Sequence, residues 1–296
     1  MPGPVKQLGV VVAVDGSSVS TVAARWAARE AAMRSIPLTV VHAVSTPAAT
    51  FPPVPYPESL VTNLEDEGKK AIMHAVKVAE EAMPADRKVP IGRKLVYSTP
   101  ASALLTMSDT AEMIVIGNSG RGVLARGLLG SVSSTVVRHA NCPVAVVRDE
   151  GLPDSPDAPV VLGTDGSPAS ELATEIAFDE ASRRGVDLVA IHAWSDAAID
   201  EVFAIDWPVM EGEAQRSLAE SLAGWQERYP DVTVHRFIAR DRAARHLIDK
   251  SETAQLAVVG SHGRGGLTRM LLGSVSNAVL HSARVPVIVA RPAASS

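Results

Sequence analysis

Short apolar runs alternate with longer amphipathic segments along the chain. The first run, residues 8–14, is apolar throughout and ends at an Asp-Gly-Ser turn that starts at Asp15. This pattern is typical of a strand buried on both faces. Residues 19–34 have helical spacing, and a second strand is expected at 37–43. Strands that alternate with helices predict an α/β fold, a parallel sheet covered by helices on both faces.

The same succession of elements occurs twice. At an offset of 150, Asp15 corresponds to Asp165 and Ala43 to Ala193. Further along, residues 114–148 agree with residues 257–291 at 19 of 35 positions, now at an offset of 143. The second copy is therefore shorter between its second strand and this stretch, where the first copy has a proline-rich loop at 46–57. The chain is predicted to be a tandem of two domains.

Each half contains further segments with strand or helix spacing. The first half is expected to have a helix at 58–83, a strand at 89–97, a helix at 101–110, a strand at 113–116, a helix at 131–139 and a strand at 142–147. The second half has counterparts at 209–228, 232–239, 242–251, 256–259, 274–282 and 285–290. Three prolines and three aspartates within residues 149–159 indicate a linker. We therefore expect domains at 1–150 and 160–296, joined by 151–159.

A glycine-rich stretch follows the apolar run at 113–116 and recurs in the second half. Its glycines keep one spacing in both copies: a glycine, two residues, a glycine, nine residues, then Gly-Ser before a helix. Glycine lets the backbone come close to a phosphate oxygen, and the amino terminus of a helix offers unpaired N–H groups. We interpret each stretch, 117–133 and 260–276, as a phosphate-binding loop.

This spacing resembles the ATP-binding signature of the universal stress protein family, and the resemblance covers nearly the whole chain as a tandem of two such domains. The resemblance implies five-stranded parallel sheets of order 3-2-1-4-5. It also implies that the backbone of Ala43 and Ala193 recognises adenine, and that the domains pair through their last strands, 144–147 and 287–290.

Other interpretations of single residues stay open. Asp15 and Asp165 either lie beside a nucleotide, where they accept hydrogen bonds from ribose hydroxyls or hold a magnesium-bound water, or are N-cap or Asx-turn residues before the next helix. Arg121 and Arg264 either reach phosphate oxygens or lie in solvent. His42 and His192 are interpreted as core histidines bonded to backbone. The expected site residues are Val14, Asp15, Ala43, Gly117, Gly120, Arg121, Gly130, Ser131, Val132, Ser133, Asp165, Ala193, Gly260, Gly263, Arg264, Gly273, Ser274, Val275 and Ser276.

Composition narrows the class of protein. Residues 1–150 carry a net charge of +2 and the remainder −7, so neither half has the strongly basic balance that duplex nucleic acid requires. No segment has the roughly 18 consecutive apolar residues of a membrane span. The single cysteine, Cys142, forms no internal disulfide, which agrees with a reducing compartment. We expect a cytoplasmic protein.

The function expected from the sequence is that of an ATP-binding universal stress protein, a nucleotide-dependent regulator or sensor with one ATP site per domain and Mg²⁺ beside the phosphates. Neither loop is a GxxxxGK[ST] motif, and no base for hydrolysis is apparent, so slow or no turnover is expected. The alternative is an adenylating or nucleotide-hydrolysing α/β enzyme, although neither HxGH nor SGGxDS occurs. A scaffold with vestigial sites and association into a homodimer also stay open.

Overall fold

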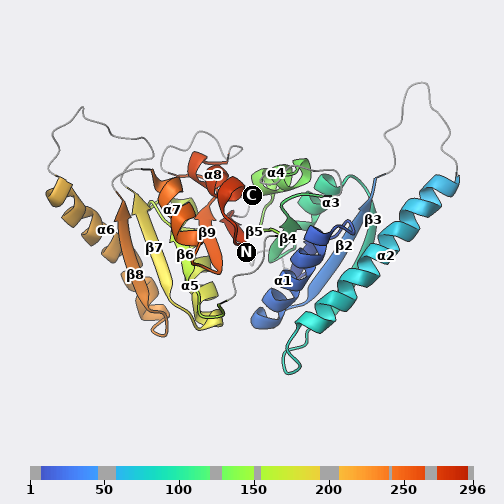
Figure 1. Cartoon of the computed structure of the whole chain (residues 1–296), viewed down its shortest axis with the longest axis horizontal. Helices are drawn as coiled ribbons and strands as arrows, with labels where there is room; N and C mark the ends of the chain where they lie inside the picture. The colour runs from blue at the N-terminus through green and yellow to red at the C-terminus, as the bar shows by residue number, and fades with distance from the viewer. Residues whose placement is uncertain are drawn as a thin grey trace, which may run out of the picture. The chain divides into compact units, whose positions relative to one another are not determined.

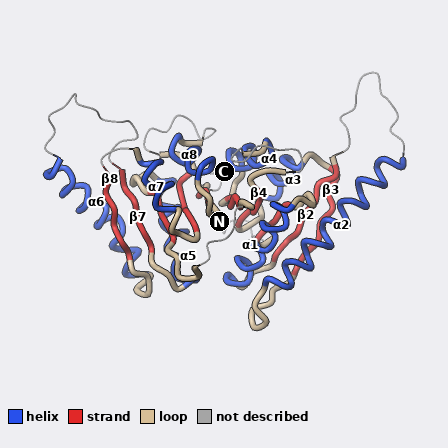
Figure 2. The backbone as a smooth tube through the Cα atoms, viewed as in Figure 1, coloured by secondary structure: helices blue, strands red, loops and turns tan. Residues whose placement is uncertain are grey.

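The structure is a computed structural model that describes residues 8–45, 58–120, 129–149, 155–193, 207–239, 242–263 and 272–292. The chain divides into two compact units, the first ending at Asp149 and the second at Pro292. Figure 1 labels most elements of both units, and Figure 2 shows helices and strands alternating along the backbone. Within the described residues, no helix combines the length and the apolar character needed to cross a membrane.

The first unit is a five-stranded parallel sheet with helices on both faces (Figure 1). Its strands lie in the order β3-β2-β1-β4-β5, as expected. Helices α1 and α2 pack against each other, and α3 packs against α4. In chain order the elements are β1 (Val10–Ala13), α1 (Ser18–Arg34), β2 (Leu38–Val44), α2 (Glu58–Ala82), β3 (Ile91–Tyr97), α3 (Pro100–Met107), β4 (Met113–Gly117), α4 (Ser131–His139) and β5 (Val144–Val147).

The second unit repeats this arrangement, with the parallel strand order β8-β7-β6-β9-β10. The expected order is thus confirmed in both halves. Its elements are β6 (Val160–Gly163), α5 (Pro168–Arg184), β7 (Leu188–Ala193), α6 (Trp207–Arg228), β8 (Val234–Ala239), α7 (Ala243–Ser251), β9 (Leu256–Gly260), α8 (Ser274–Ser282) and β10 (Val287–Ala290).

Burial explains the composition of the strands. The side chains of Val10, Val11 and Val12 in the central strand β1 have no exposed surface, because helices cover both faces. The edge strand β3 instead exposes Arg93 and Lys94, and charged side chains protect such an edge from pairing with another chain.

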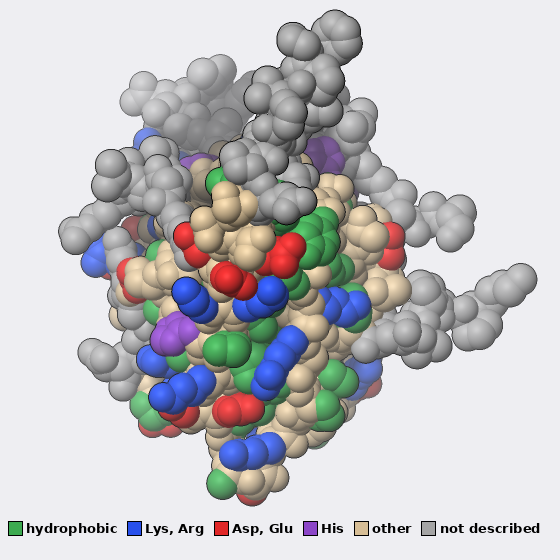
Figure 3. Space-filling view, turned by 90° about the vertical axis from the view of Figure 1, so that its right-hand side faces the viewer, with side chains coloured by type: hydrophobic (Ala, Val, Ile, Leu, Met, Phe, Trp, Pro, Cys, Tyr) green, Lys and Arg blue, Asp and Glu red, His purple; other side chains and the backbone are tan. Residues whose placement is uncertain are grey.

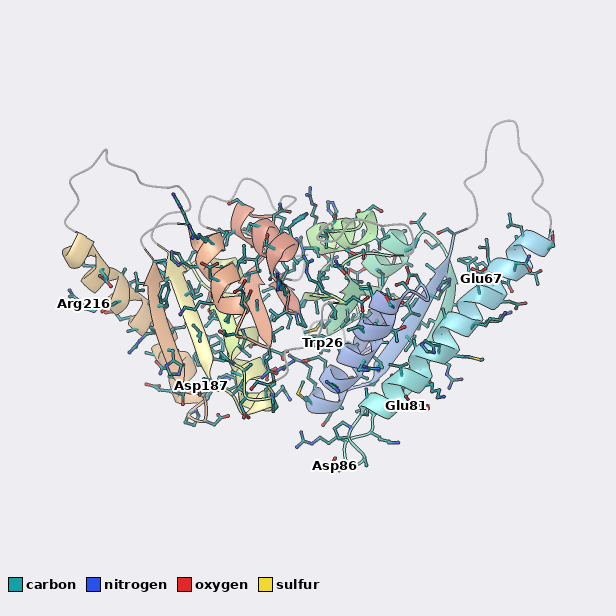
Figure 4. All side chains as sticks on the ribbon, in the orientation of Figure 1. Trp26, Glu67, Glu81, Asp86, Asp187 and Arg216 are labelled. Atoms are coloured by element: carbon teal, nitrogen blue, oxygen red, sulfur yellow. The ribbon has the colours of Figure 1, made fainter. Side chains whose placement is uncertain are left out.

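The outer surface of the first unit mixes charges of both signs. Figure 3 shows Lys and Arg side chains interspersed with Asp and Glu. On α2, Lys69 lies 3.4 Å from both Glu65 and Asp66, and Figure 4 shows Glu67 and Glu81 on the same helix. These charged residues lie on the solvent-facing side of α2, which accounts for the amphipathic pattern of its sequence.

The residue that caps the carboxyl end of α1 is of a different type from the equivalent residue that caps α5. Both helices end with a residue in the left-handed conformation, Ser35 (φ 54°) after α1 and Gly185 (φ 66°) after α5. Glycine adopts this conformation without the steric penalty that a β-carbon causes. A β-carbon at Gly185 would meet nothing within 4 Å, so the difference between the two caps is one of backbone conformation alone.

We predict that Ser35→Gly stabilises the protein by about 0.5–1 kcal/mol and that Gly185→Ser destabilises it by a similar amount. The free energy of unfolding, measured by urea denaturation of the full chain, checks both. Ser35→Ala is the control, because it keeps the β-carbon and should change little. Equal effects of the glycine and alanine variants at position 35 would contradict the argument.

Candidate functional site

Asp15 lies directly beyond the end of β1. Its Oδ1 accepts hydrogen bonds from the backbone N–H of Ser17 at 2.9 Å and from the Ser17 hydroxyl at 2.6 Å. Ser17 in turn is the N-cap of α1, where its Oγ accepts from the N–H of Ser20 at 3.1 Å. The Asx turn is therefore present, and it holds the carboxylate at the carboxyl edge of the sheet.

In the loop after β4, Gly120 lies next to the Asp15 carboxylate. A β-carbon at Gly120 would lie 2.8 Å from Asp15 Oδ2, closer than side chains pack. Because β1 and β4 are neighbours in the sheet, the turns that follow them open at the same edge. The missing side chain of Gly120 is what allows the two turns to approach.

The second unit has the same contacts. Asp165 Oδ1 accepts from the N–H of Ser167 at 2.9 Å, and a β-carbon at Gly263 would lie 2.5 Å from Asp165 Oδ2. The pairing of Asp15 with Gly120 is thus repeated by Asp165 with Gly263, which the matched spacing of the sequence anticipates.

The amino terminus of α4 leaves unpaired N–H groups at the loop. Gly130 is the N-cap and provides no side-chain hydrogen bond. Its own N–H donates to the Asn118 carbonyl at 2.7 Å, so this amide is engaged by the protein. The first-turn amides of Ser131, Val132 and Ser133 have no acceptor among the described residues.

Ser133 closes the loop onto the helix. Its hydroxyl donates to the Gly117 carbonyl at 2.7 Å, and Ser276 makes the equivalent bond to Gly260. The protons of these two hydroxyls are therefore engaged in holding the two ends of each loop together. Ser131, by contrast, is exposed and is the first residue of its helix rather than its cap.

A cavity of about 350 Å³ opens at this edge of the first sheet. One part of its wall is apolar, formed by side chains from β2, α3 and β4, and the other part is formed by Asp15 and the glycine loop. The predicted residues Val14, Ala43 and Val132 also line it. The full lining is Ala13, Val14, Asp15, Ser20, Val41, His42, Ala43, Pro100, Ala103, Leu104, Ile116, Gly117, Ser119, Gly120, Gly130, Ser131, Val132 and Ser133.

Two lining features have structural explanations. A β-carbon at Gly117 would lie 2.7 Å from Val19 Cγ1, so this glycine also lets α1 pack against β4. His42 Nδ1 lies 2.7 Å from the Val14 carbonyl, and His192 Nδ1 lies 3.0 Å from the Thr164 carbonyl. Because a carbonyl only accepts, Nδ1 carries the proton in each ring. Both histidines are bonded to backbone, as interpreted from the sequence.

Other predicted residues have simpler positions. Ala193 is the last residue of β7, Gly260 ends β9, and Gly273, Ser274 and Val275 lie at the start of α8. Arg121, Arg264 and the proline-rich segment 46–57 lie outside the described residues.

Sequence reasoning missed the α3 wall, formed by Pro100, Ala103 and Leu104, and it missed Ser119. The position of Ser119 between two motif glycines was a usable signal. The α3 contacts had none, because they depend on how the helix packs on the sheet.

Each unit is therefore a doubly wound α/β domain with a glycine-rich loop beside an aspartate at the switch point of its sheet. The family model for the universal stress protein family matches residues 9–148 and 158–291, and the chain belongs to this family. It is 62% identical over 293 residues to universal stress protein Rv2005c of Mycobacterium tuberculosis, covering 98% of this chain and 99% of that protein.

A second relative and a solved structure agree. Universal stress protein Rv2623 of Mycobacterium tuberculosis is 51% identical over 286 residues, covering 96% of both chains. The crystal structure of a universal stress protein from Archaeoglobus fulgidus has a TM-score of 0.68 at 20% identity, covering 96% of this chain and 98% of that one. At this identity the structural likeness concerns the fold.

We predict that Ser133→Ala lowers the free energy of unfolding by about 1–3 kcal/mol, because it leaves the Gly117 carbonyl without its donor. Urea denaturation of the full chain measures this effect. Ser131→Ala serves as the matched control, since that side chain is exposed and should change stability by less than about 0.5 kcal/mol. Equal losses in the two variants would contradict the role of the Ser133 bond.

Proposed function

We propose that each half of the chain binds one ATP at the edge described above, and that the protein acts as a nucleotide-dependent stress-response regulator. The observation that carries the proposal is the contact of Gly120 with Asp15 beside the open amides of α4. A glycine backbone next to a helix amino terminus suits phosphate, and a carboxylate at the same edge suits ribose hydroxyls.

The cavity fits the parts of a nucleotide. Its volume of about 350 Å³ lies in the range of small-molecule sites, roughly 300–1,000 Å³. Val41, Leu104 and Ile116 provide apolar surface for an adenine ring, and the backbone of Ala43 lies beside them. The amides of the α4 amino terminus lie at the other part of the cavity, where the phosphates would bind.

Mg²⁺ would accompany the phosphates. The described residues include no cluster of three or more His, Cys, Asp or Glu side chains that could hold a metal ion by themselves. Mg²⁺ commonly keeps several waters and uses one or two carboxylates together with substrate phosphates. In this proposal the phosphates would hold the ion, and Asp15 in the first half and Asp165 in the second would contact it through water. The ion would neutralise part of the phosphate charge.

Slow or absent hydrolysis follows from the same lining. Of the described residues around the cavity, Asp15 and His42 are the titratable ones. Asp15 Oδ1 is engaged by Ser17, and His42 Nδ1 by the Val14 carbonyl. Neither contact positions a base beside a water at the phosphate end.

Pairing of the two domains through their last strands stays a prediction from the resemblance.

Nucleotide stoichiometry tests the proposal. We expect calorimetric titration of nucleotide-free protein with Mg-ATP to give two sites per chain, or extraction of purified protein to release bound adenine nucleotide. Product release measured in parallel should show far less than one turnover per minute. A nucleotide-free protein that also fails to bind added ATP would refute ATP binding, and fast multiple turnover would favour the enzyme hypothesis.

Substitution of the paired glycines tests each site separately. Gly120→Ala should weaken ATP binding in the first half about tenfold, because its β-carbon displaces the Asp15 carboxylate. Gly263→Ala should do the same in the second half only. Gly224→Ala is the control, since a β-carbon there meets nothing within 4 Å. Unchanged affinity in both site variants would contradict the placement of the nucleotide.

A further inference from the structure

Several residues that line the first cavity are replaced in the second unit, and the replacement between the motif glycines changes a hydroxyl to an imidazole. In the first unit Ser119, between the motif glycines, lines the cavity. At the offset of 143 its equivalent is His262, and the residue before it changes from Asn118 to Ser261. The surrounding framework is the same in both units, because both the contact of glycine with aspartate and the closing serine bond are repeated.

The His262 ring is held from one side. Its Nδ1 lies 3.0 Å from the hydroxyl oxygen of Ser261, whose side chain is buried with 1% exposure. The Ser261 hydroxyl has no other acceptor among the described residues. Leaving a buried hydroxyl proton unpaired is costly, so Ser261 donates and Nδ1 accepts.

This tautomer places the remaining proton on Nε2. His262 itself is half-buried, and within the described part of the chain no group accepts from Nε2. The second loop therefore carries an imidazole N–H donor at the sequence position where the first loop carries the Ser119 hydroxyl. An imidazole donor reaches farther from the backbone than a hydroxyl.

We propose that His262 is a specificity-determining residue of the second site, where its Nε2–H donates to the phosphate tail of the bound nucleotide. This inference rests on the proposed ATP binding. The second site then prefers ATP over adenosine more strongly than the first site does, because the imidazole N–H reaches the phosphate better than the Ser119 hydroxyl does and makes no contact with the nucleoside. Ser261 is its positioning residue.

The experiment reads each site in the full chain by blocking the other. Gly120→Val blocks the first site and Gly263→Val the second, since both β-carbons would overlap the aspartate carboxylate. Calorimetric titration then gives the affinities for ATP and for adenosine. In the Gly120→Val background, His262→Ser should weaken ATP binding about five- to tenfold and leave adenosine binding unchanged.

Two matched variants test whether the effect comes from the N–H donor or from the shape of the side chain. His262→Gln keeps an N–H donor and should retain most of the ATP affinity. Ser119→His combined with Asn118→Ser, in the Gly263→Val background, supplies both the imidazole and its positioning hydroxyl, so it should strengthen ATP binding at the first site without affecting adenosine, and it remains informative if a His262 variant misfolds.

The outcomes distinguish the two proposals. Absence of ATP binding in both backgrounds overturns the proposed function. If ATP binds but His262→Ser leaves its affinity unchanged, or weakens ATP and adenosine equally, the role of His262 is overturned while the proposed function stands. A selective loss of ATP affinity in His262→Ser that His262→Gln largely restores supports both.

Discussion

The approach of Gly120 to the Asp15 carboxylate is the constraint on which the rest of the site depends. Strands β1 and β4 lie side by side in register, so their following turns meet at one edge of the sheet. Any side chain at position 120 would collide with Asp15 Oδ2. Glycine therefore lets the carboxylate keep its place beside the loop, and the same arrangement occurs at Asp165 and Gly263.

Some polar groups of the loop form hydrogen bonds within the protein, and others stay available. Within the loop, the N–H of Gly130 and the hydroxyl of Ser133 are engaged by carbonyls of Asn118 and Gly117. These bonds fix where the loop begins and where α4 starts. The first-turn amides of α4 are left over because a helix cannot satisfy them internally. The two ends of the loop are thus held by these hydrogen bonds, and the first-turn amides of α4 stay available.

Much of this arrangement was predictable from local pattern, and the rest was not. The strands are apolar runs because helices bury both faces, and the repeated spacing indicated paired loops. The sheet order came from the family resemblance. Spacing could not tell that Gly117 makes room for Val19, or that Ser133 bonds the Gly117 carbonyl. Those roles depend on how closely the helices approach the sheet, and the spacing of residues in one sequence does not reveal that distance.

Comparison of the two units distinguishes a framework, the contacts that hold the loops, from a lining, the residues that face the site. Contacts that hold the loops, namely aspartate to glycine, serine to carbonyl and histidine to carbonyl, occur in both units. Positions facing the site have diverged. Where the first unit has Ala13, the second has Gly163, and a β-carbon there would lie 2.9 Å from Leu247, the equivalent of Leu104. The leucine of the second unit therefore packs into space that a β-carbon occupies in the first. Since the framework fixes the backbone and the lining sets the shape, the two repeats have different side chains at equivalent positions of this edge.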